Sequence, residues 1–509
     1  MQESWATSTG VDLHLDLSLA AASGRRDGLE SALREAVRSG RLAPGEKLPS
    51  TRALAAQLGL SRGTVAAAYD QLVAEGHLVA RHGSGTEVAP RPASDSPRQQ
   101  VAPRPTAAAP TTGRPVQPWY DFRPGSPDAS AFPVAAWLRS TRHALGAAPP
   151  SAFGYGDPAG RPELREALAD CLGRARGVVA SPERIVITSG YVQALALLSD
   201  ILRRRGVTEA AMEEPGLAFH RQIVSRAGLS IRPLPVDELG IQADLLALTR
   251  HSRVGAVVVT AANQFPFGVA LAPERRRALA GWAERTGGVV IEDDYDGEFR
   301  YDRQPVGALQ GMAPDQVVYI GTASKTLGPA LRLAWMVLPP GLVTEMAEAK
   351  LHADYQTDAL SQSALADFIT THAYDRHIRA CRLRYRSRRD LLLTRIGGLA
   401  TAHATLGASV PVPATHTIDA GLHALITLPP GGLDETALIA RAKLAGIALE
   451  GLAPYWHKSG ARNSSRAQPQ GIVLGYATPP ERSYPAAVDA LIRLLSTALR
   501  ERFRTRSRG

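Results

Sequence analysis

A proline-rich stretch divides the 509-residue chain into two parts. Residues 89–118 contain eight prolines among alanine, threonine, serine and scattered arginine. Such a segment favours the extended polyproline II conformation and resists packing into a core. We therefore predict that it is a linker between two folded domains, 25–88 and 119–509, with an N-terminal arm at 1–24. At about 3.1 Å per residue, the linker can carry the first domain to a distant surface, including that of another subunit.

Composition excludes several classes of protein. The chain contains no apolar run long enough to span a bilayer, and its first residues lack the basic and apolar regions of a signal peptide. Two cysteines, Cys171 and Cys381, are too few for a disulfide framework or a four-ligand zinc site. We therefore expect a cytoplasmic protein without a bound metal. The net charge of +10 permits an anionic partner but does not identify one.

The second part is organised around one lysine, Lys325, in the stretch VVYIGTASKTLG. Residues 317–320 predict a short buried strand, and the small residues 321–324 allow the chain to turn tightly. Only five of the 58 basic residues are lysines, so arginine is the usual cation of this chain. A desolvated lysine can lose its proton and form a Schiff base, which arginine cannot do. A lysine without chemical function at the end of a strand is the alternative interpretation.

An acidic cluster follows another predicted strand, in GGVVIEDDYDGEF. Residues 289–291 predict a buried parallel strand, and α/β sheets bind ligands at the carboxyl ends of such strands. Pyridoxal phosphate (PLP) needs a lysine for its aldehyde, a carboxylate for its ring nitrogen and donors for its phosphate. Arg332, seven residues after Lys325, can supply a phosphate fork. The acidic cluster alone also fits a solvated loop or a metal site, but the two stretches in this order favour PLP.

The first domain predicts three helices followed by two short strands. Leu29, Leu33 and Val37 recur at helical spacing. Ser50 and Ser61 stand where they can cap two further helices. A helix, a tight turn and a second helix is the geometry that places the second helix in the major groove of DNA. The two strands would flank the turn Gly83-Ser84-Gly85 as a wing.

From LPSTRALAAQLGLSRGTV through this turn, residues 25–88 resemble the winged-helix domain of GntR-type regulators. Arginines at helix starts can contact phosphates or guanine edges, and capping hydroxyls can hold phosphate. Solvated surface charges are the alternative for each arginine. The net charge of this region does not distinguish DNA binding from a solvated surface, because the region contains nine Lys/Arg and seven Asp/Glu residues. The resemblance implies DNA contacts from Arg52, Ser61, Arg62, Thr64, His82 and Gly83.

The second domain alternates strands with helices, which predicts an α/β fold with a mostly parallel sheet. In IVITSGYVQALALLSDIL, a strand leads through Ser189 and Gly190 into a helix, and this is a suitable phosphate seat. Together with the lysine and acidic motifs, it makes the domain similar to class I aminotransferases of fold type I. The whole chain thus resembles MocR-type regulators, which fuse a GntR-type winged helix to an aminotransferase-like domain. The resemblance runs from Arg25 to about Tyr476.

This resemblance implies a set of cofactor contacts. Lys325 would bind the PLP aldehyde, and Asp293 would pair with the ring nitrogen, with Asp294 as its competitor. Tyr295 would bond the ring hydroxyl, with Asn263 or Gln264 beside it. Gly190, Tyr191, Thr322, Ser324 and Arg332 would hold the phosphate, and Tyr155 would reach the phosphate in the other subunit.

Three stretches leave questions open. The aromatic residue expected after EEPG is Leu217 here, with Phe219 two residues later, so the ring-stacking residue is undetermined. The arginine that binds a substrate carboxylate is absent from AQPQGIVLGYATPP, and the upstream loop residues Arg462 and Arg466 are possible replacements or solvated charges. The third stretch is a predicted helix that presents either a solvated face or a surface for DNA backbone. This face consists of Arg379, Arg382, Arg386 and Arg389.

The sequence thus predicts a homodimeric PLP-dependent transcriptional regulator, with winged helices exchanged between subunits. Its partners would be an operator DNA and a small effector. Because the carboxylate-binding arginine is missing, PLP itself is the simplest effector, and the regulated genes would then serve vitamin B6 synthesis. An amino acid or amine such as GABA or taurine is the alternative. A working aminotransferase, or an aminotransferase-like domain that serves only for dimerisation, also stays open.

Overall fold

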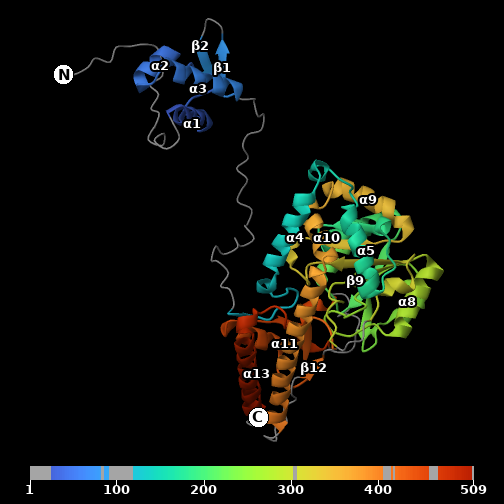
Figure 1. The fold of residues 1–509 in the computed structure, drawn as a ribbon. Helices are drawn as coiled ribbons and strands as arrows, with labels where there is room; N and C mark the ends of the chain where they lie inside the picture. Colours follow the sequence, from blue (N-terminus) through green and yellow to red (C-terminus); the bar gives the residue numbers. More distant parts are fainter. Residues whose placement is uncertain are drawn as a thin grey trace. The chain divides into compact units, whose positions relative to one another are not determined.

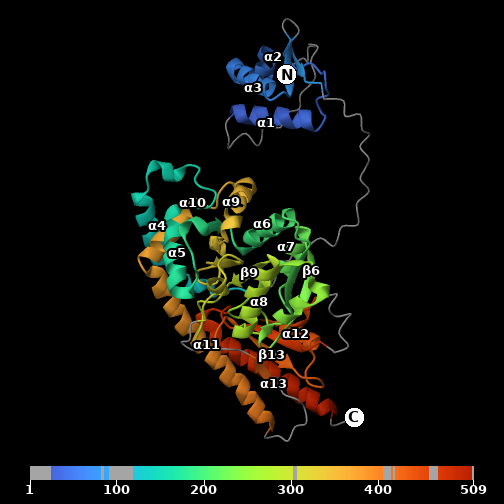
Figure 2. The ribbon, with the colours of Figure 1, turned by 90° about the vertical axis from the view of Figure 1, so that its right-hand side faces the viewer.

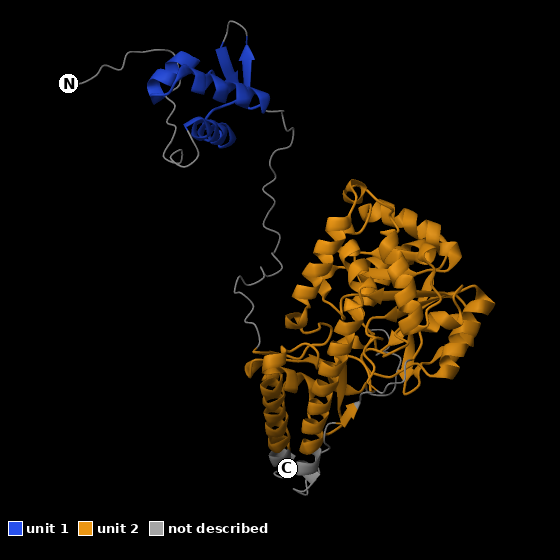
Figure 3. Cartoon of the chain, viewed as in Figure 1, with its two compact units in different colours: residues 1–114 blue, residues 115–509 orange. Residues whose placement is uncertain are grey.

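The computed structural model divides the chain into two compact units, residues 1–114 and 115–509 (Figure 3). No helix among the described residues is long and apolar enough to cross a membrane. Residues 91–118 of the predicted linker, the wing residues His82 and Gly83, and the loop residues Arg462 and Arg466 lie outside the described residues. Described are residues 25–81, 85–90, 119–301, 306–404, 414–416, 419–457 and 468–506.

Unit 1 is a three-helix domain with a two-stranded antiparallel sheet. The Ser50 and Ser61 hydroxyls accept hydrogen bonds from backbone N–H groups three residues later, at 3.2 and 3.0 Å, and so cap α2 and α3. Gly59 ends α2 with a φ of 64°, where a left-handed residue is required. The caps predicted from the sequence are therefore confirmed. The elements are α1 (Arg25–Arg38), α2 (Thr51–Leu58), α3 (Arg62–Ala74), β1 (Leu78–Arg81) and β2 (Gly85–Val88).

Unit 2 is built on an eight-stranded mixed sheet. Five neighbouring strands, β10, β9, β8, β5 and β6, run parallel, whereas β11 is antiparallel to both β10 and β4. The prediction of a mostly parallel α/β sheet is confirmed. In spatial order the strands are β4 (Ile185–Thr188), β11 (Ala334–Val337), β10 (Val317–Thr322), β9 (Val289–Asp294), β8 (Val254–Val259), β5 (Glu209–Glu214), β6 (Ser230–Asp237) and β7 (Gly240–Ile241).

Helices cover both faces of this sheet, because successive side chains of a strand point to opposite sides. On β10, Val318 and Ile320 pack in the cluster that contains α6 and α9, whereas Tyr319 packs in the cluster of α5 and α10. Strands β4, β5, β10 and β11 are consequently buried along their whole length. The helices are α4 (Val134–Ala147), α5 (Pro162–Arg176), α6 (Tyr191–Arg204), α7 (Ala218–Arg226), α8 (Pro273–Thr286), α9 (Pro340–Asp354) and α10 (Ala359–Thr370).

A smaller antiparallel sheet, β12-β13-β16-β15, forms the C-terminal part of unit 2. The long helices α11 and α13 pack against each other beside it (Figures 1 and 2). The strand that follows the predicted linker, β3, pairs in parallel with β14 and so joins this part. The elements are β3 (Tyr120–Asp121), α11 (Ala373–Ala404), β12 (Ala414–His416), β13 (His423–Leu428), α12 (Glu435–Leu444), β14 (Ile447–Ala448), β15 (Glu450–Gly451), β16 (Gln470–Gly475) and α13 (Tyr484–Arg506).

The four arginines expected on one face of α11 do not form a uniform solvated surface. Arg379 and Arg386 are exposed, but Arg389 is buried and pairs with Asp419 at 2.6 Å. Arg382 donates to the Glu298 carbonyl at 2.5 Å. A solvated face is thus only partly present, because neighbouring elements cover part of this helix, which helical spacing alone does not reveal. The alternative, a surface for DNA backbone, stays a prediction.

Candidate functional site

The carboxyl ends of β9 and β10 meet at a cavity of about 420 Å³. Lys325 follows β10 by three residues, and Asp293 is the penultimate residue of β9. The two strands are parallel neighbours, with Ile320 opposite Asp293, so both side chains reach the same edge of the sheet. Both line the cavity. Two residues that the sequence identified in separate motifs are thus brought together by strand register.

The Lys325 amine is desolvated. It donates a hydrogen bond to the Gly125 carbonyl, on the chain segment that enters unit 2. Burial lowers the pKa of Lys325, and the carboxylates of Asp293 and Asp296 oppose this effect. A lowered pKa increases the share of neutral amine, which is the nucleophilic form.

Asp293 and Asp294 point to opposite faces of β9, and their surroundings differ. Asp293 faces the cavity, where burial raises its pKa well above the usual range. Asp294 accepts two hydrogen bonds from the buried Arg176 guanidinium, at 2.8 and 3.0 Å, and one from the Tyr319 hydroxyl at 2.8 Å. Only Asp293 is therefore free to pair with a cation inside the cavity.

Tyr295 lines the cavity next to the loop after β8. Its hydroxyl donates to the Asn263 carbonyl at 3.0 Å. The Asn263 amide instead donates to Asp296 at 2.8 Å, and the Gln264 amide donates to the Pro215 carbonyl at 2.9 Å. Of Tyr295, Asn263 and Gln264, Tyr295 is the residue that lines the cavity.

Hydrogen-bond donors gather at one end of the cavity. Arg332 lines this end together with Thr322 and Ser324, and its guanidinium donates to the Ser189 carbonyl at 2.7 Å. Gly190 has a φ of 102°, and a Cβ there would lie 2.5 Å from the Arg332 guanidinium. The absence of a side chain therefore keeps the guanidinium and the first N–H groups of α6 accessible to an anion.

The sequence motifs did not identify one aromatic side chain of the cavity, His220. His220 lines the cavity, its ring lies 4.6 Å from that of Tyr191, and its Nδ1 is 3.7 Å from Asp293. Burial lowers the pKa of His220 to about 4, so its ring is neutral. Leu217 also lines the cavity, whereas Phe219 is 54% exposed. Leu217 is the N-cap residue of α7 and precedes His220 by three residues, and this spacing is the signal that could have identified the histidine.

Tyr155 lies outside this cavity. Its side chain is 82% exposed, and its ring lies 4.5 Å from that of Tyr355. Its expected contact belongs to another subunit, so this role stays a prediction.

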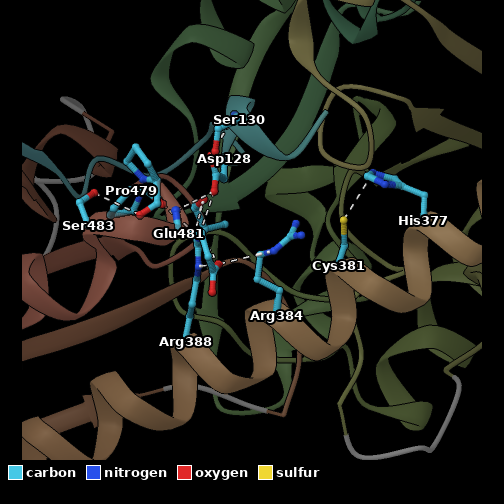
Figure 4. Close-up of polar contacts among 11 residues, drawn as sticks. Asp128, Ser130, His377, Cys381, Arg384, Arg388, Pro479, Glu481 and Ser483 are labelled. Carbon is cyan, nitrogen blue, oxygen red and sulfur yellow. Dashed lines mark hydrogen bonds and ion pairs between the residues drawn. The ribbon is translucent and has the colours of Figure 1, made fainter. Parts of the chain in front are cut away.

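A loop at the start of unit 2 closes one side of the cavity through Gly125 and Ser126. This loop is held by Arg388 of α11, which donates to Asp128 at 2.8 Å and to Glu481 at 2.7 Å (Figure 4). Figure 4 shows both carboxylates converging on the one guanidinium, with Arg384 beside them. Arg388 is thus a structural anchor for the segment that Lys325 contacts.

The described DNA-binding candidates lie at the starts of α2 and α3 in unit 1. Arg52 and Arg62 are exposed, and neither forms an ion pair within the described part of the chain. The Ser61 and Thr64 hydroxyls are hydrogen-bonded to each other at 2.8 Å. The exposed, unpaired guanidinium groups leave this surface able to bind phosphate or base edges.

The donor set of the cavity in unit 2 fits PLP. A buried carboxylate, a desolvated lysine and an anion cradle formed around a glycine are the three groups that this cofactor requires.

Comparison with protein families matches both units. Residues 25–88 match the gntR family of bacterial regulatory proteins, and residues 125–410 match aminotransferase class I and II. The pyridoxine biosynthesis transcriptional regulator PdxR of Corynebacterium glutamicum is 32% identical over 89% of this chain and 92% of its own length. The probable rhizopine catabolism regulatory protein MocR of Rhizobium meliloti is 33% identical over 88% of this chain and 89% of its own.

Solved structures share the fold of unit 2. An archaeal alanine:glyoxylate aminotransferase matches with a TM-score of 0.64 and 24% identity, over 74% of this chain and 91% of that one. A Pyrococcus horikoshii kynurenine aminotransferase, solved in complex with PMP, has a TM-score of 0.63, also at 24% identity, over the same shares of the two chains.

Proposed function

Since the chain belongs to the MocR-type transcriptional regulators, which join a GntR-type helix-turn-helix domain to a fold type I aminotransferase domain, we propose that it regulates transcription through PLP bound in unit 2. The observation that carries this proposal is the convergence of Lys325, Asp293 and the Gly190–Arg332 cradle on one cavity. Operator DNA would be bound by unit 1. The activity is regulatory, and the solved aminotransferases support only the fold.

The residues of the cavity have distinct tasks in holding PLP. When bound, PLP supplies an aldehyde that accepts amines and a ring that withdraws electrons. Lys325 offers its amine, and burial lowers its pKa, which increases the share of the neutral, nucleophilic form. Asp293 offers a carboxylate to the ring nitrogen, and Tyr295 offers its hydroxyl to the ring oxygen. Thr322, Ser324, Arg332 and the first N–H groups of α6 would bind the phosphate.

Binding to DNA would rest on the starts of α2 and α3 and on the wing. Arg52 and Arg62 are exposed and unpaired, which supports contacts to phosphate or to base edges. His82 and Gly83 would extend the contact at the wing. A homodimer with exchanged winged helices is the arrangement we propose, and the exposed ring pair of Tyr155 and Tyr355 supports a partner surface there.

PLP itself is the simplest effector. Arg332 is the only arginine among the described lining residues, and it lies at the phosphate end. An α-carboxylate would thus lack the bidentate partner that aminotransferase substrates need. A relative named for pyridoxine biosynthesis supports a cofactor-responsive regulator, and we propose that such genes are its targets. A relative named TauR, 31% identical, keeps an amine effector as the alternative.

Borohydride reduction of the PLP-loaded full chain, followed by peptide mapping, tests the cofactor site. We expect a pyridoxyl group on Lys325. The same group on Lys350, Lys443 or Lys458 would contradict the assignment.

Operator binding by apo-protein, PLP-loaded protein, and loaded protein with each of the twenty amino acids, GABA or taurine tests the effector. We expect PLP alone to change the affinity. If PLP alone changes nothing and one amine shifts both the cofactor absorbance and DNA binding, PLP is not the effector.

A further inference from the structure

The cavity has a further group of lining residues that the cofactor residues do not explain. It is formed by the small sheet and the chain next to it: His423 begins β13, Glu450 begins β15, and Tyr455 follows shortly after. Phe265 connects them, with its ring 4.8 Å from His423 and 5.0 Å from Tyr455. We name these four residues the distal wall. Apolar surroundings such as these rings lower the effective dielectric constant and so strengthen charge interactions.

His423, one of these lining residues, has an unused hydrogen-bond acceptor. Its side chain is 4% exposed, and its Nε2 has no hydrogen-bond partner. The ring is hydrogen-bonded to the Pro266 backbone, and burial lowers its pKa to about 4. A neutral ring that donates through Nδ1 carries a lone pair on Nε2. This atom can accept a hydrogen bond from a ligand.

Glu450 adds a negative charge at the same wall. It lines the cavity. Burial raises the pKa of the neighbouring Tyr455, and the negative charge of Glu450 raises it further. The charge of Glu450 interacts with Arg123, which is itself held by Asp121 through two hydrogen bonds of 2.9 and 2.6 Å. The Glu450 charge is therefore not neutralised by an ion pair of its own among the described residues.

The two ends of the cavity consequently have opposite polarity. Lys325 and Arg332 are the lining cations among the described residues, and both belong to the cofactor end. A carboxylate placed at the distal wall would meet Glu450 without a compensating cation, and an unpaired buried charge is costly. An ammonium or hydroxyl group would instead donate to Glu450 and to the His423 Nε2, and hydrogen bonds to a charged group are the strong ones.

We propose that the distal wall is a binding subsite for a small aliphatic amine that carries a second ammonium or hydroxyl group, and that it rejects carboxylates. This rests on the proposed function, because such a ligand would bind in the same cavity as PLP. The chemical class is that of diamines and amino alcohols, and amino acids are excluded.

Three ligands of similar length isolate the distal group: putrescine ends in an ammonium, GABA in a carboxylate and butylamine in a methyl group. Their affinities for the PLP-loaded full chain can be measured by calorimetry. We expect putrescine to bind about tenfold or more tightly than either of the others, because a charge-assisted hydrogen bond accounts for a factor of this size. Equal or tighter binding of GABA, or butylamine binding as tightly as putrescine, would overturn the proposal.

Substitutions at Glu450 test the origin of the preference. Glu450→Gln should reduce the preference for putrescine over GABA about tenfold, and Glu450→Lys should reverse it in favour of GABA. A reversal cannot result from misfolding, so the second variant keeps the test decisive. Glu284→Gln, which removes an exposed carboxylate of α8, should leave the preference unchanged. An unchanged preference in both Glu450 variants would overturn the proposal.

The borohydride map of each preparation separates the two hypotheses. If Lys325 carries no pyridoxyl group, the proposed function fails. If Lys325 is labelled but putrescine shows no preference, only the distal wall is wrong. Binding of GABA that is lost in Arg462→Ala or Arg466→Ala would equally overturn the exclusion of carboxylates.

Discussion

The two units use charged side chains in opposite ways. In unit 1, Arg52 and Arg62 are exposed and unpaired, which suits a polyanion that brings its own charge. In unit 2, Lys325 and Asp293 are desolvated. Burial lowers the pKa of Lys325 and raises that of Asp293, and both shifts favour the neutral form. A surface that recognises DNA thus relies on accessible charge, whereas a cavity that binds a cofactor relies on withholding water. Substitutions in the two units should therefore change different properties.

The largest effect is expected at Lys325. Lys325→Ala should abolish the borohydride-fixed pyridoxyl group completely, because alanine has no amine, while the fold is kept. Lys443→Ala, at an exposed lysine of α12, is the matched control and should label normally. Mass spectrometry of the intact reduced protein measures both. Labelling that persists in Lys325→Ala would mean that another amine holds the cofactor.

The next effect distinguishes two neighbouring residues of β9. Asp294→Asn should destabilise unit 2 by about 3–5 kcal/mol, because it leaves the buried Arg176 guanidinium without its ion pair. Asp293→Asn should change stability far less but weaken PLP binding, because its carboxylate faces the cavity. Denaturant unfolding and PLP titration measure the two properties. If both variants lost the same property, the division between the two faces of the strand would be wrong.

In unit 1 the expected effects are smaller. Arg62→Ala should weaken operator binding by about 1–3 kcal/mol if it reads a base, with reduced discrimination at that position. If it contacts only phosphate, binding should weaken on all sequences, and the salt slope should fall by about one. Arg26→Ala removes the same charge from α1 and serves as the control. Salt titrations on operator and random duplexes that show no change for Arg62→Ala would exclude this helix as the reader.

The smallest effect concerns Ser61. Ser61→Ala should destabilise unit 1 by about 1 kcal/mol, because the hydroxyl accepts the Thr64 N–H and caps α3. Ser61→Asp should restore the cap and yet weaken DNA binding, because it adds a negative charge at the proposed contact surface. Thermal unfolding and DNA titration separate the two roles. If the aspartate variant bound DNA normally, Ser61 would not face the duplex.

Local patterns in the sequence predicted the secondary-structure elements that position both sites. The caps of α2 and α3 and the strands before Lys325 and Asp293 depend on a few adjacent residues, so the sequence states them directly. The choice between Asp293 and Asp294 needed the structure as well, because it depends on which face of β9 each packing helix covers.

The distal wall could not be predicted in the same way. His423 and Glu450 lie in a separate sheet, about a hundred residues or more after Lys325, and no motif surrounds them. They reach the cavity only because β13 and β15 are paired through β16 and packed against the loop that contains Phe265. The same limitation explains the arginines of α11, whose helical spacing gives their angular order but not which of them a neighbouring element buries.

We propose that cofactor binding in unit 2 controls DNA binding by unit 1. It is tested by measuring the affinity of the full chain for an operator selected from random duplexes, with and without PLP, in the unsubstituted chain and in Lys325→Ala. The account predicts that PLP changes the affinity of the unsubstituted chain and leaves that of Lys325→Ala unchanged. Equal affinities of the unsubstituted chain with and without PLP, or an equal response in both proteins, would contradict it.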